Sequence, residues 1–256
     1  MSTALITGGT VGIGHAFAQE LAKQGWDLVL ASRDEAGLLA VARDFRRTYG
    51  ITVEVIRTDL SVRSEVLALA DRLEDQTRPI DLLVNNAGFA VHDSVVTGDI
   101  DQHQRAMDVM CMAVLILSGA AARAMKVRGF GAILNVTSSS SVITTGHYSA
   151  IKAWATVYTE GLANELRGTG VRAMAVLPGW VKTEFHSRGG VKAHNLPGIV
   201  WIDAGRLARE ALDDLAAGKV LSVPTKRWAF AVWVGHVLPR TATRWLSRTL
   251  TKSRET

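Results

Sequence analysis

The segment Tyr148-Ser149-Ala150-Ile151-Lys152 places a phenol and an ammonium at a spacing that suits proton transfer. In a helix, one turn separates the two side chains, so both lie on the same face. An ammonium about 4 Å from the phenol favours the phenolate by roughly 4 kcal/mol at an effective dielectric near 20, which is about three pKa units. We therefore expect Lys152 to lower the pKa of Tyr148 toward neutrality. A packed ring beside a solvated amine has the same spacing, so other parts of the chain must support this interpretation.

A glycine-rich turn near the N-terminus indicates a site for a dinucleotide. The apolar residues 2–7 precede Gly8, Gly12 and Gly14, and residues 15–23 have apolar side chains at helical spacing. Glycine lets the backbone turn sharply and approach a pyrophosphate, and the N-terminus of the following helix offers free N–H groups and a partial positive charge. A tight turn without a ligand is the alternative, which the order of strand, glycine turn and helix disfavours.

The end of the next predicted strand, residues 26–31, indicates which dinucleotide binds. A site for NAD is expected to offer a carboxylate to the ribose 2′-hydroxyl here, but the chain has Ser32 and Arg33. Arginine presents a fork of donors that suits a 2′-phosphate, so we predict NADP(H) in preference to NAD(H). The alternative is that Arg33 is a solvated charge at the start of a helix that Asp34 caps.

Apolar segments recur along the chain with stretches between most of them that are long enough for a crossover helix. They are centred on Leu5 and Val29 and on residues 53–56, 80–84, 132–136, 171–177 and 220–223. Such alternation predicts an α/β fold: a three-layer, doubly wound Rossmann fold with a seven-stranded parallel sheet. In this architecture ligands bind beyond the carboxyl ends of the strands. With 256 residues and no low-complexity or charged linker, we predict one domain over residues 1–256.

Together these motifs resemble those of the short-chain dehydrogenase/reductase family, of the single-domain type, over residues 3 to about 223. The segment Thr7-Gly8-x-x-x-Gly12-Ile13-Gly14 matches the coenzyme loop of the family, and Asp59-Leu60 matches its adenine contact. Asn85-Asn86-Ala87-Gly88 matches the signature of its fourth strand, and Pro178-Gly179 with Thr183 matches the segment over the nicotinamide. Ser138, Tyr148 and Lys152 match the catalytic set of the family.

The resemblance implies hydride transfer between a nicotinamide and a carbonyl or secondary alcohol. Tyr148 would be the acid or base, Lys152 would lower its pKa and hold the nicotinamide ribose, and Ser138 would hold the substrate oxygen, with Ser139 as the alternative. The cofactor-binding residues implied are Gly8, Thr10, Gly12, Ile13, Gly14, Ser32, Arg33, Asp59, Leu60, Asn86, Ala87, Gly88, Tyr148, Lys152, Pro178, Gly179, Val181 and Thr183.

Met110 departs from the family pattern. Family members usually have an asparagine here, which helps to shape a helix distortion whose carbonyl holds a water linked to the lysine. Methionine offers no amide hydrogen bonds, so we expect a slower enzyme, unless another polar group or water takes over. A catalytically weak NADP-sensing or partner-binding protein on the same fold is the alternative function.

Composition bounds the remaining classes of function. The single cysteine, Cys111, lies in an apolar helical stretch, and the seven histidines have no metal-ligand spacing, so we expect neither disulfide nor metal. His147, beside the tyrosine, is expected to be scaffolding or pocket lining. We find no room for a signal peptide before the first strand and no apolar run near the length of a membrane span, and therefore expect a cytoplasmic protein. No nucleic-acid recognition pattern accompanies the net charge of +5.

Two segments should decide what the protein binds. Residues 184–201 occupy the place of the substrate lid in the family, and their glycines, aromatic and aliphatic residues suggest a moving lid over an apolar substrate. In the tail, residues 225–256, an apolar stretch is followed by Arg240, Arg244, Arg248 and Lys252 beside Trp245. The tail has two interpretations. It is a pair of helices that packs on the domain or on a second subunit, or it makes a peripheral contact with a membrane surface. The resemblance also implies a homodimer or homotetramer, but neither natural substrate nor reaction direction.

Overall fold

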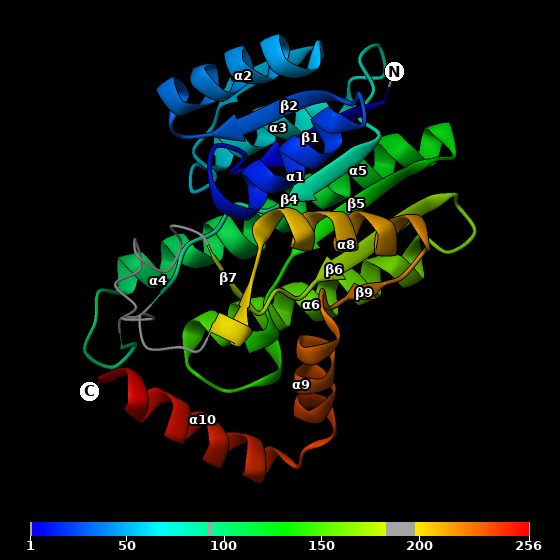
Figure 1. Cartoon of the computed structure of the whole chain (residues 1–256). Coiled ribbons are helices and arrows are strands. Elements are labelled where there is room, and N and C mark those ends of the chain that lie inside the picture. Colours follow the sequence, from blue (N-terminus) through cyan, green and yellow to red (C-terminus); the bar gives the residue numbers. More distant parts are fainter. Residues whose placement is uncertain (1, 92–93, 183–197, 256) are drawn as a thin grey trace.

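The structure is a computed structural model, and it describes residues 2–91, 94–182 and 198–255. Its main sheet has seven parallel strands in the order β3-β2-β1-β4-β5-β6-β9 (Figure 1). These strands are β1 (Thr3–Thr7), β2 (Asp27–Ser32), β3 (Val53–Arg57), β4 (Leu82–Asn85), β5 (Gly131–Val136), β6 (Val171–Val176) and β9 (Leu221–Ser222). The predicted doubly wound fold and all seven predicted strands are confirmed.

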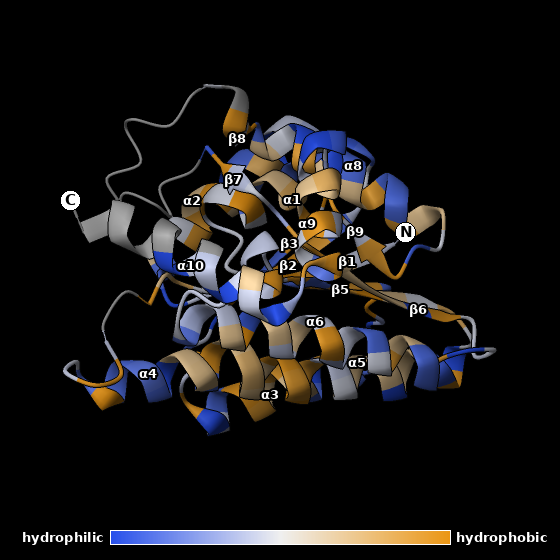
Figure 2. Ribbon diagram, turned by 90° about the horizontal axis from the view of Figure 1, so that it is seen from below, coloured by the Kyte–Doolittle hydropathy of each residue, from blue (hydrophilic) through white to orange (hydrophobic). Residues whose placement is uncertain are grey.

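Helices cover both faces of the sheet and bury its apolar side chains (Figure 2). On one face lie α1 (Gly12–Lys23), α2 (Glu35–Tyr49) and α8 (Ala204–Ala216), and on the other lie α3 (Arg63–Glu74), α5 (Ala113–Arg128) and α6 (His147–Glu165). Phe17 and Phe45 are fully buried in the core of the first face, and Leu5 and Leu83 in the core of the second. Strands covered on both sides are nearly continuous apolar runs, which is why their sequences reveal them so clearly.

A long helix crosses the second face without a break in direction. It comprises α4 (Ile100–Met107), a π-helical turn (Asp108–Met112) and α5. By length and composition alone, this helix of residues 100–128 could span a membrane. Leu117, Ala121 and Met125 are nevertheless buried in the core of the second face, so the apolar composition of α5 is explained by packing on the sheet.

Between β6 and α8 the chain forms short elements outside the main sheet. A second, two-stranded parallel sheet pairs β7 (Trp180–Val181) with β8 (Trp201–Ile202), and a 3₁₀ turn (Gly198–Val200) precedes β8. The tail forms two helices, α9 (Lys226–Val237) and α10 (Arg240–Glu255), which extend away from the sheet and end at the C-terminus (Figure 1). Residues 184–197 of the predicted lid, which runs from 184 to 201, and the predicted site residue Thr183 lie outside the described residues.

Candidate active site

The glycine turn between β1 and α1 has the backbone that the sequence predicts. Gly8 and Gly12 have positive φ angles of +69° and +62°, which side chains disfavour. A Cβ atom on Gly14 would lie 2.3 Å from the carbonyl oxygen of Gly8 and from Nδ2 of Asn86. The turn is therefore built so that no side chain stands between its backbone and a ligand.

Two side chains tie this turn to the end of β4. Thr7 Oγ1 accepts hydrogen bonds from the N–H groups of Asn86 (3.0 Å) and Ala87 (3.1 Å). Asn86 Nδ2 donates to the carbonyl oxygens of Thr7 (3.0 Å) and Gly8 (3.2 Å). Four hydrogen bonds thus fix the glycine turn against Asn86 and Ala87, as the joint presence of both motifs in the sequence implied.

The first turn of α1 suits an anionic ligand. Its N-cap residue, Val11, makes no side-chain cap, and no acidic residue lies in the first turn, so the helix dipole is not neutralised there. Together with the glycine turn, this helix end offers backbone N–H groups to a pyrophosphate. The residues present therefore fit a dinucleotide, with Thr10 and Ile13 partly buried beside the turn.

Ser32 is the last residue of β2, and Arg33 and Asp34 follow it at the same edge of the sheet. Asp34 Oδ1 accepts from the N–H of Gly37 (3.0 Å), so the predicted cap of the next helix is confirmed. Arg33 is exposed, and among the described residues its guanidinium forms no ion pair. Its charge reaches Asp59: partial burial raises the pKa of that carboxyl, but hydrogen bonds from Ser61 and the charges of Arg105 and Arg33 lower it overall. Arg33 and the predicted adenine contact Asp59 are therefore neighbours.

Tyr148, Lys152 and Ser138 come together beyond the carboxyl end of β5. Tyr148 and Lys152 are one turn apart in α6, and Lys152 Nζ lies 5.7 Å from the centre of the Tyr148 ring. The ammonium is buried and donates to the carbonyl oxygen of Val136 (3.0 Å). Tyr148 is partly buried and makes a hydrogen bond with the Ser138 side chain.

The acidities in this cluster differ from the expectation. Burial raises the pKa of Tyr148 to about 12, and the hydrogen bond with Ser138 opposes this only in part. Burial also lowers the pKa of Lys152 to about 8. The predicted fall of the Tyr148 pKa toward neutrality is therefore wrong for this structure, because burial disfavours the charged form of each group and outweighs their attraction. At neutral pH Tyr148 holds its proton and can donate it.

Of the two serines that the sequence left open, the structure gives a side-chain contact with Tyr148 for Ser138. Ser138 follows β5 in an extended conformation, and its Oγ accepts from the N–H (3.1 Å) and the hydroxyl (2.9 Å) of Ser140. The N–H of Ser139 instead donates to the carbonyl oxygen of Pro178 (2.8 Å). This bond brings the predicted nicotinamide segment, Pro178-Gly179, to the edge of the cluster, and Val181 behind it is buried.

Met110 lies beside the cluster. The helix is π-helical from Asp108 to Met112, so the distortion associated with asparagine in the family is present here with methionine. A Cβ atom on Gly88 would lie 3.0 Å from Met110 Sδ and 3.7 Å from Lys152 Nζ, so Gly88 leaves room for both side chains. Cys111 is buried, as expected, and burial raises the pKa of its thiol to about 11.

A pair of histidines supports the start of α6. His103 Nδ1 and His147 Nδ1 are 2.8 Å apart, so one of them donates to the other. Burial and the nearby charge of His103 lower the pKa of His147. His103 belongs to α4, and the pair therefore links α4 to the turn that carries Tyr148. The contact agrees with the scaffolding role expected for His147, but nothing in the sequence indicated its partner.

A buried row of polar side chains crosses the fold behind the site. Asn85 Nδ2 donates to Ser118 Oγ (3.0 Å) and to Asn135 Oδ1 (2.9 Å), and Asn135 Nδ2 donates to Thr159 Oγ1 (2.9 Å). These residues come from α5, β4, β5 and α6 and are at most 5% exposed. The sequence motifs indicated only Asn85 of this row, although an asparagine near the end of each of two adjacent apolar strands was the available signal.

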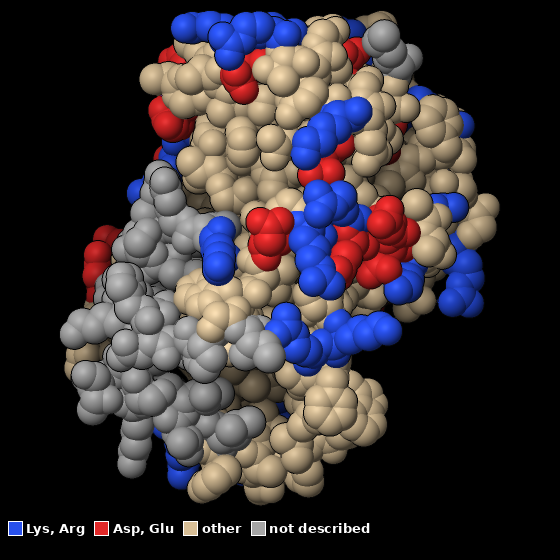
Figure 3. All heavy atoms as spheres, viewed as in Figure 1, with Lys and Arg blue, Asp and Glu red and all other residues tan. Residues whose placement is uncertain are grey.

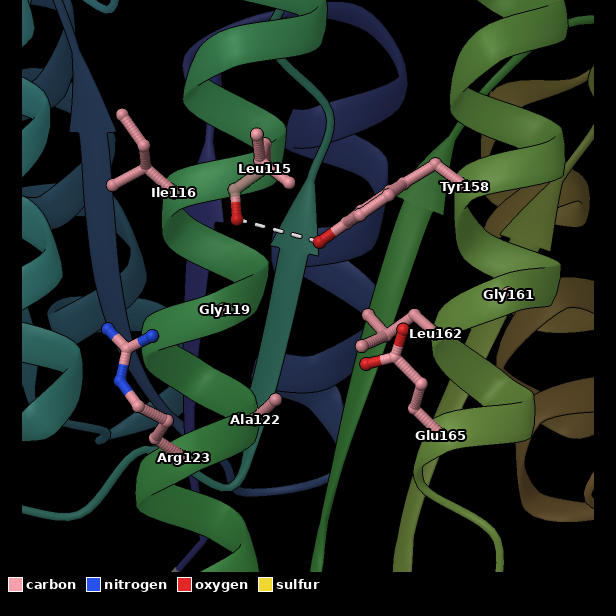
Figure 4. Close-up of a pocket in the computed structure, with 9 residues that line it drawn as sticks. All are labelled: Leu115, Ile116, Gly119, Ala122, Arg123, Tyr158, Gly161, Leu162 and Glu165. Carbon is pink, nitrogen blue, oxygen red and sulfur yellow. Dashed lines mark hydrogen bonds between the residues drawn. The ribbon is translucent and has the colours of Figure 1, made fainter.

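A groove of about 670 Å³ lies between α5 and α6, away from this cluster (Figure 4). Its lining includes Leu115, Tyr158 and Leu162, and the Tyr158 hydroxyl donates to the Leu115 carbonyl oxygen (3.5 Å). None of the predicted site residues lines it. The groove is therefore a feature of the outer face of these helices and not of the site at the sheet edge.

Comparison with known proteins agrees with this geometry. The family model described as short chain dehydrogenase matches residues 2–190. An uncharacterized oxidoreductase of Staphylococcus saprophyticus is 34% identical over 183 residues, which is 70% of this chain and 78% of that protein. A short-chain dehydrogenase from Sphingobium yanoikuyae in complex with NADPH is 30% identical, with a TM-score of 0.84 over 92% of this chain and 94% of its own.

A second solved structure differs in its cofactor. A short-chain dehydrogenase/reductase from Burkholderia phymatum in complex with NAD is 25% identical, with a TM-score of 0.81 over 92% of each chain. Similar structures thus hold either NADPH or NAD. The glycine turn, the matched family model and these relatives lead to one conclusion: the chain belongs to the short-chain dehydrogenase/reductase family and is a nicotinamide-dependent oxidoreductase acting on CH-OH or C=O groups.

Proposed function

We propose that this protein is an NADP(H)-dependent reductase of ketones or aldehydes with an apolar body. The observation that carries the proposal is the grouping of three side chains at the carboxyl edge of the sheet: Ser138 interacts with the Tyr148 phenol, and the buried Lys152 Nζ lies 5.7 Å from the centre of its ring. A protonated phenol at the carboxyl edge of the sheet suits protonation of a carbonyl oxygen, which is the reducing direction.

Three residues of the chain have separate roles in this reaction. A bound nicotinamide supplies the hydride that the carbonyl carbon accepts. Tyr148 gives its phenolic proton to the carbonyl oxygen, so that the product is an alcohol. Ser138 holds the same oxygen by a hydrogen bond. Lys152 donates to the Val136 carbonyl oxygen. Its ammonium charge lies near the tyrosinate that forms and stabilises it.

The preference for the phosphorylated cofactor rests on Arg33. Its guanidinium is exposed at the end of β2, and among the described residues it forms no ion pair, so its donors remain available for a 2′-phosphate. Asp34 is used as the cap of α2, which takes the nearest carboxylate away from a ribose hydroxyl. The NADPH complex of the Sphingobium relative agrees with this assignment, although the Burkholderia relative holds NAD.

The test is consumption of NADPH and NADH with a panel of aldehydes and ketones of increasing apolar size. We expect faster turnover with NADPH and with larger apolar substrates, and a loss of about 100-fold or more in kcat for Tyr148→Phe. Arg33→Ala should weaken NADPH binding about ten-fold or more and leave NADH binding unchanged. Arg47→Ala, at an exposed arginine of α2, is the control. Equal use of both cofactors by the parent protein would refute the NADP preference.

A protein that only binds NADP remains the second function, because Met110 departs from the family. The intact π-helical turn at Asp108–Met112 argues for the enzyme. Binding of NADPH without turnover of any carbonyl in the panel, in either direction, would instead support the sensing function.

We also propose that α5 and α6 form the contact of a homodimer. Their outer face holds the groove of Figure 4, whose lining residue Leu115 is 40% exposed. Val157, next to the lining residue Tyr158 in α6, is 68% exposed. Val157→Glu should then shift the protein to a monomer in sedimentation velocity. An unchanged sedimentation coefficient would contradict this contact.

A further inference from the structure

The C-terminal helices carry the excess positive charge of the protein. Residues 226–255 contain seven lysines or arginines and one glutamate, a net charge of +6, whereas the whole chain has +5. The rest of the chain is therefore slightly acidic, and the positive charge is concentrated in the part that extends from the domain (Figure 1).

These cations differ from those elsewhere on the surface. In α8, Arg206 pairs with Glu210 (2.7 Å) and Arg209 with Glu20 (3.3 Å). In the part of the chain that the structure describes, no ion pair involves the exposed cations of α9 and α10, which are Lys226, Arg227, Arg240, Arg244 and Arg248. No side chain that the structure describes therefore neutralises their charge through an ion pair, and this charge favours an anionic surface.

One face of α9 is anchored to the domain, and the other is apolar and exposed. On the anchored face, Trp228 packs over Gly179 and donates to the Val200 carbonyl oxygen (3.1 Å), and Val232 is buried. On the other face, Phe230, Trp233 and Val237 are 65%, 58% and 58% exposed. The first two rings stack with centres 5.9 Å apart. In Figure 3 the surface over α9 is almost free of charge below a group of basic side chains.

The next helix repeats this arrangement. Ser247 is buried and accepts from the N–H of Thr144 (2.9 Å), which fixes α10 to the segment before α6. Arg244 and Arg248 are exposed one turn apart and, with Thr241 and the 70% exposed Trp245, line a groove of about 360 Å³. The lining of this groove therefore combines an exposed indole with two guanidinium groups, which suit an apolar surface and phosphate oxygens respectively.

We infer that α9 and α10 dock the protein on an anionic membrane surface. Aromatic and aliphatic side chains that would enter the headgroup boundary, with arginines beside them for lipid phosphates, are typical of interfacial helices. Nucleic acid would use the arginines but would leave Phe230, Trp233 and Val237 in water. Trp228 ties α9 to the segment after Pro178, and the bond from Thr144 ties α10 to the segment after Ser138. Docking would therefore bring the sheet edge with Tyr148 near the membrane.

The experiment is co-sedimentation of the full chain with vesicles of phosphatidylcholine alone, or with one third phosphatidylglycerol. We expect binding to the anionic vesicles that is lost at about 0.5 M salt. The double variant Arg244→Glu, Arg248→Glu should bind at least about ten-fold more weakly. Arg43→Glu, Arg47→Glu makes the same charge change at exposed positions one turn apart in α2 and should bind like the parent.

A second double variant tests the contribution of the exposed apolar side chains to vesicle binding. Phe230→Ser, Trp233→Ser removes two exposed rings without touching the buried Val232, and should weaken vesicle binding while the circular dichroism spectrum stays unchanged. Absence of binding by the parent, equal binding to both kinds of vesicle, or an unaffected Arg244→Glu, Arg248→Glu variant would each overturn the inference. A concentration-dependent dimer that Phe230→Ser, Trp233→Ser dissociates would do so as well, because a second copy would then cover this face. NADPH binding and turnover are measured separately, so these outcomes leave the proposed function untouched.

Discussion

Replacing Thr7 with valine should separate the two motifs that form the cofactor cradle. Thr7 is 1% exposed, and its hydroxyl is the acceptor for the N–H groups of both Asn86 and Ala87. Valine has almost the same shape but no acceptor, so two backbone donors lose their partner. Each donor left without a partner costs about 1–3 kcal/mol, and the added methyl group returns about 1 kcal/mol. We expect Thr7→Val to lower the free energy of unfolding by about 1–5 kcal/mol.

Thr7→Ser is the matched control, since serine keeps the acceptor and loses only a buried methyl group, at a cost of about 1 kcal/mol. Urea denaturation followed by circular dichroism gives the free energies, and NADPH titration gives the effect on the cofactor site. We expect weaker NADPH binding for Thr7→Val, because Asn86 also holds the Gly8 carbonyl oxygen. Two results would refute the reasoning: a free energy of unfolding for Thr7→Val within 0.5 kcal/mol of the parent, or a Thr7→Ser protein destabilised as much as Thr7→Val. Either shows that the Thr7 hydroxyl does not stabilise the contact between the glycine turn and the end of β4.

Three further predictions concern the same site. Gly14→Ala places a methyl group 2.3 Å from the Gly8 carbonyl oxygen, so NADPH binding should weaken at least about ten-fold, whereas Gly161→Ala, with open space around its Cβ, should bind NADPH like the parent; equal affinities would contradict the close approach. Because the pKa of Lys152 is lowered to about 8 in the fold from about 10.5 unfolded, the unfolded chain binds more protons between these values, and stability due to this group should rise with pH there by roughly 3 kcal/mol. Lys152→Met should remove that rise in denaturation curves, and an unchanged pH dependence would show that the amine is solvated. Met110→Asn should increase kcat if an amide completes proton delivery to Lys152, and no increase with any carbonyl substrate would favour a water or another polar group in that role.

The sequence allowed prediction of the sheet because its strands are buried on both faces. Their apolar runs are bounded by glycines, and the carboxyl ends of parallel strands meet at one edge, so the sequence predicts that Gly8, Asn86 and Ser138 lie at the same edge of the sheet. The helical spacing of Tyr148 and Lys152 was equally readable.

Electrostatic details could not be predicted in the same way. The Tyr148 pKa depends on burial by elements distant in the chain. The helical spacing predicts the attraction between Lys152 and the phenolate, but not the free-energy cost of burying the charged phenolate. The contact between His103 and His147 joins residues 44 positions apart and has no local signal. The choice between Ser138 and Ser139 likewise depended on which side chain turns toward Tyr148.

The buried row of Ser118, Asn85, Asn135 and Thr159 constrains how this protein can change over generations. Replacing any single member by an apolar residue leaves a buried donor or acceptor of its neighbour without a hydrogen-bond partner. The free energy of unfolding then falls, because that group is unpaired in a low-dielectric interior. Replacing all four could be tolerated, but every intermediate on the way would be less stable than either end. We therefore expect these four positions to behave as one inherited unit, altered together or retained together.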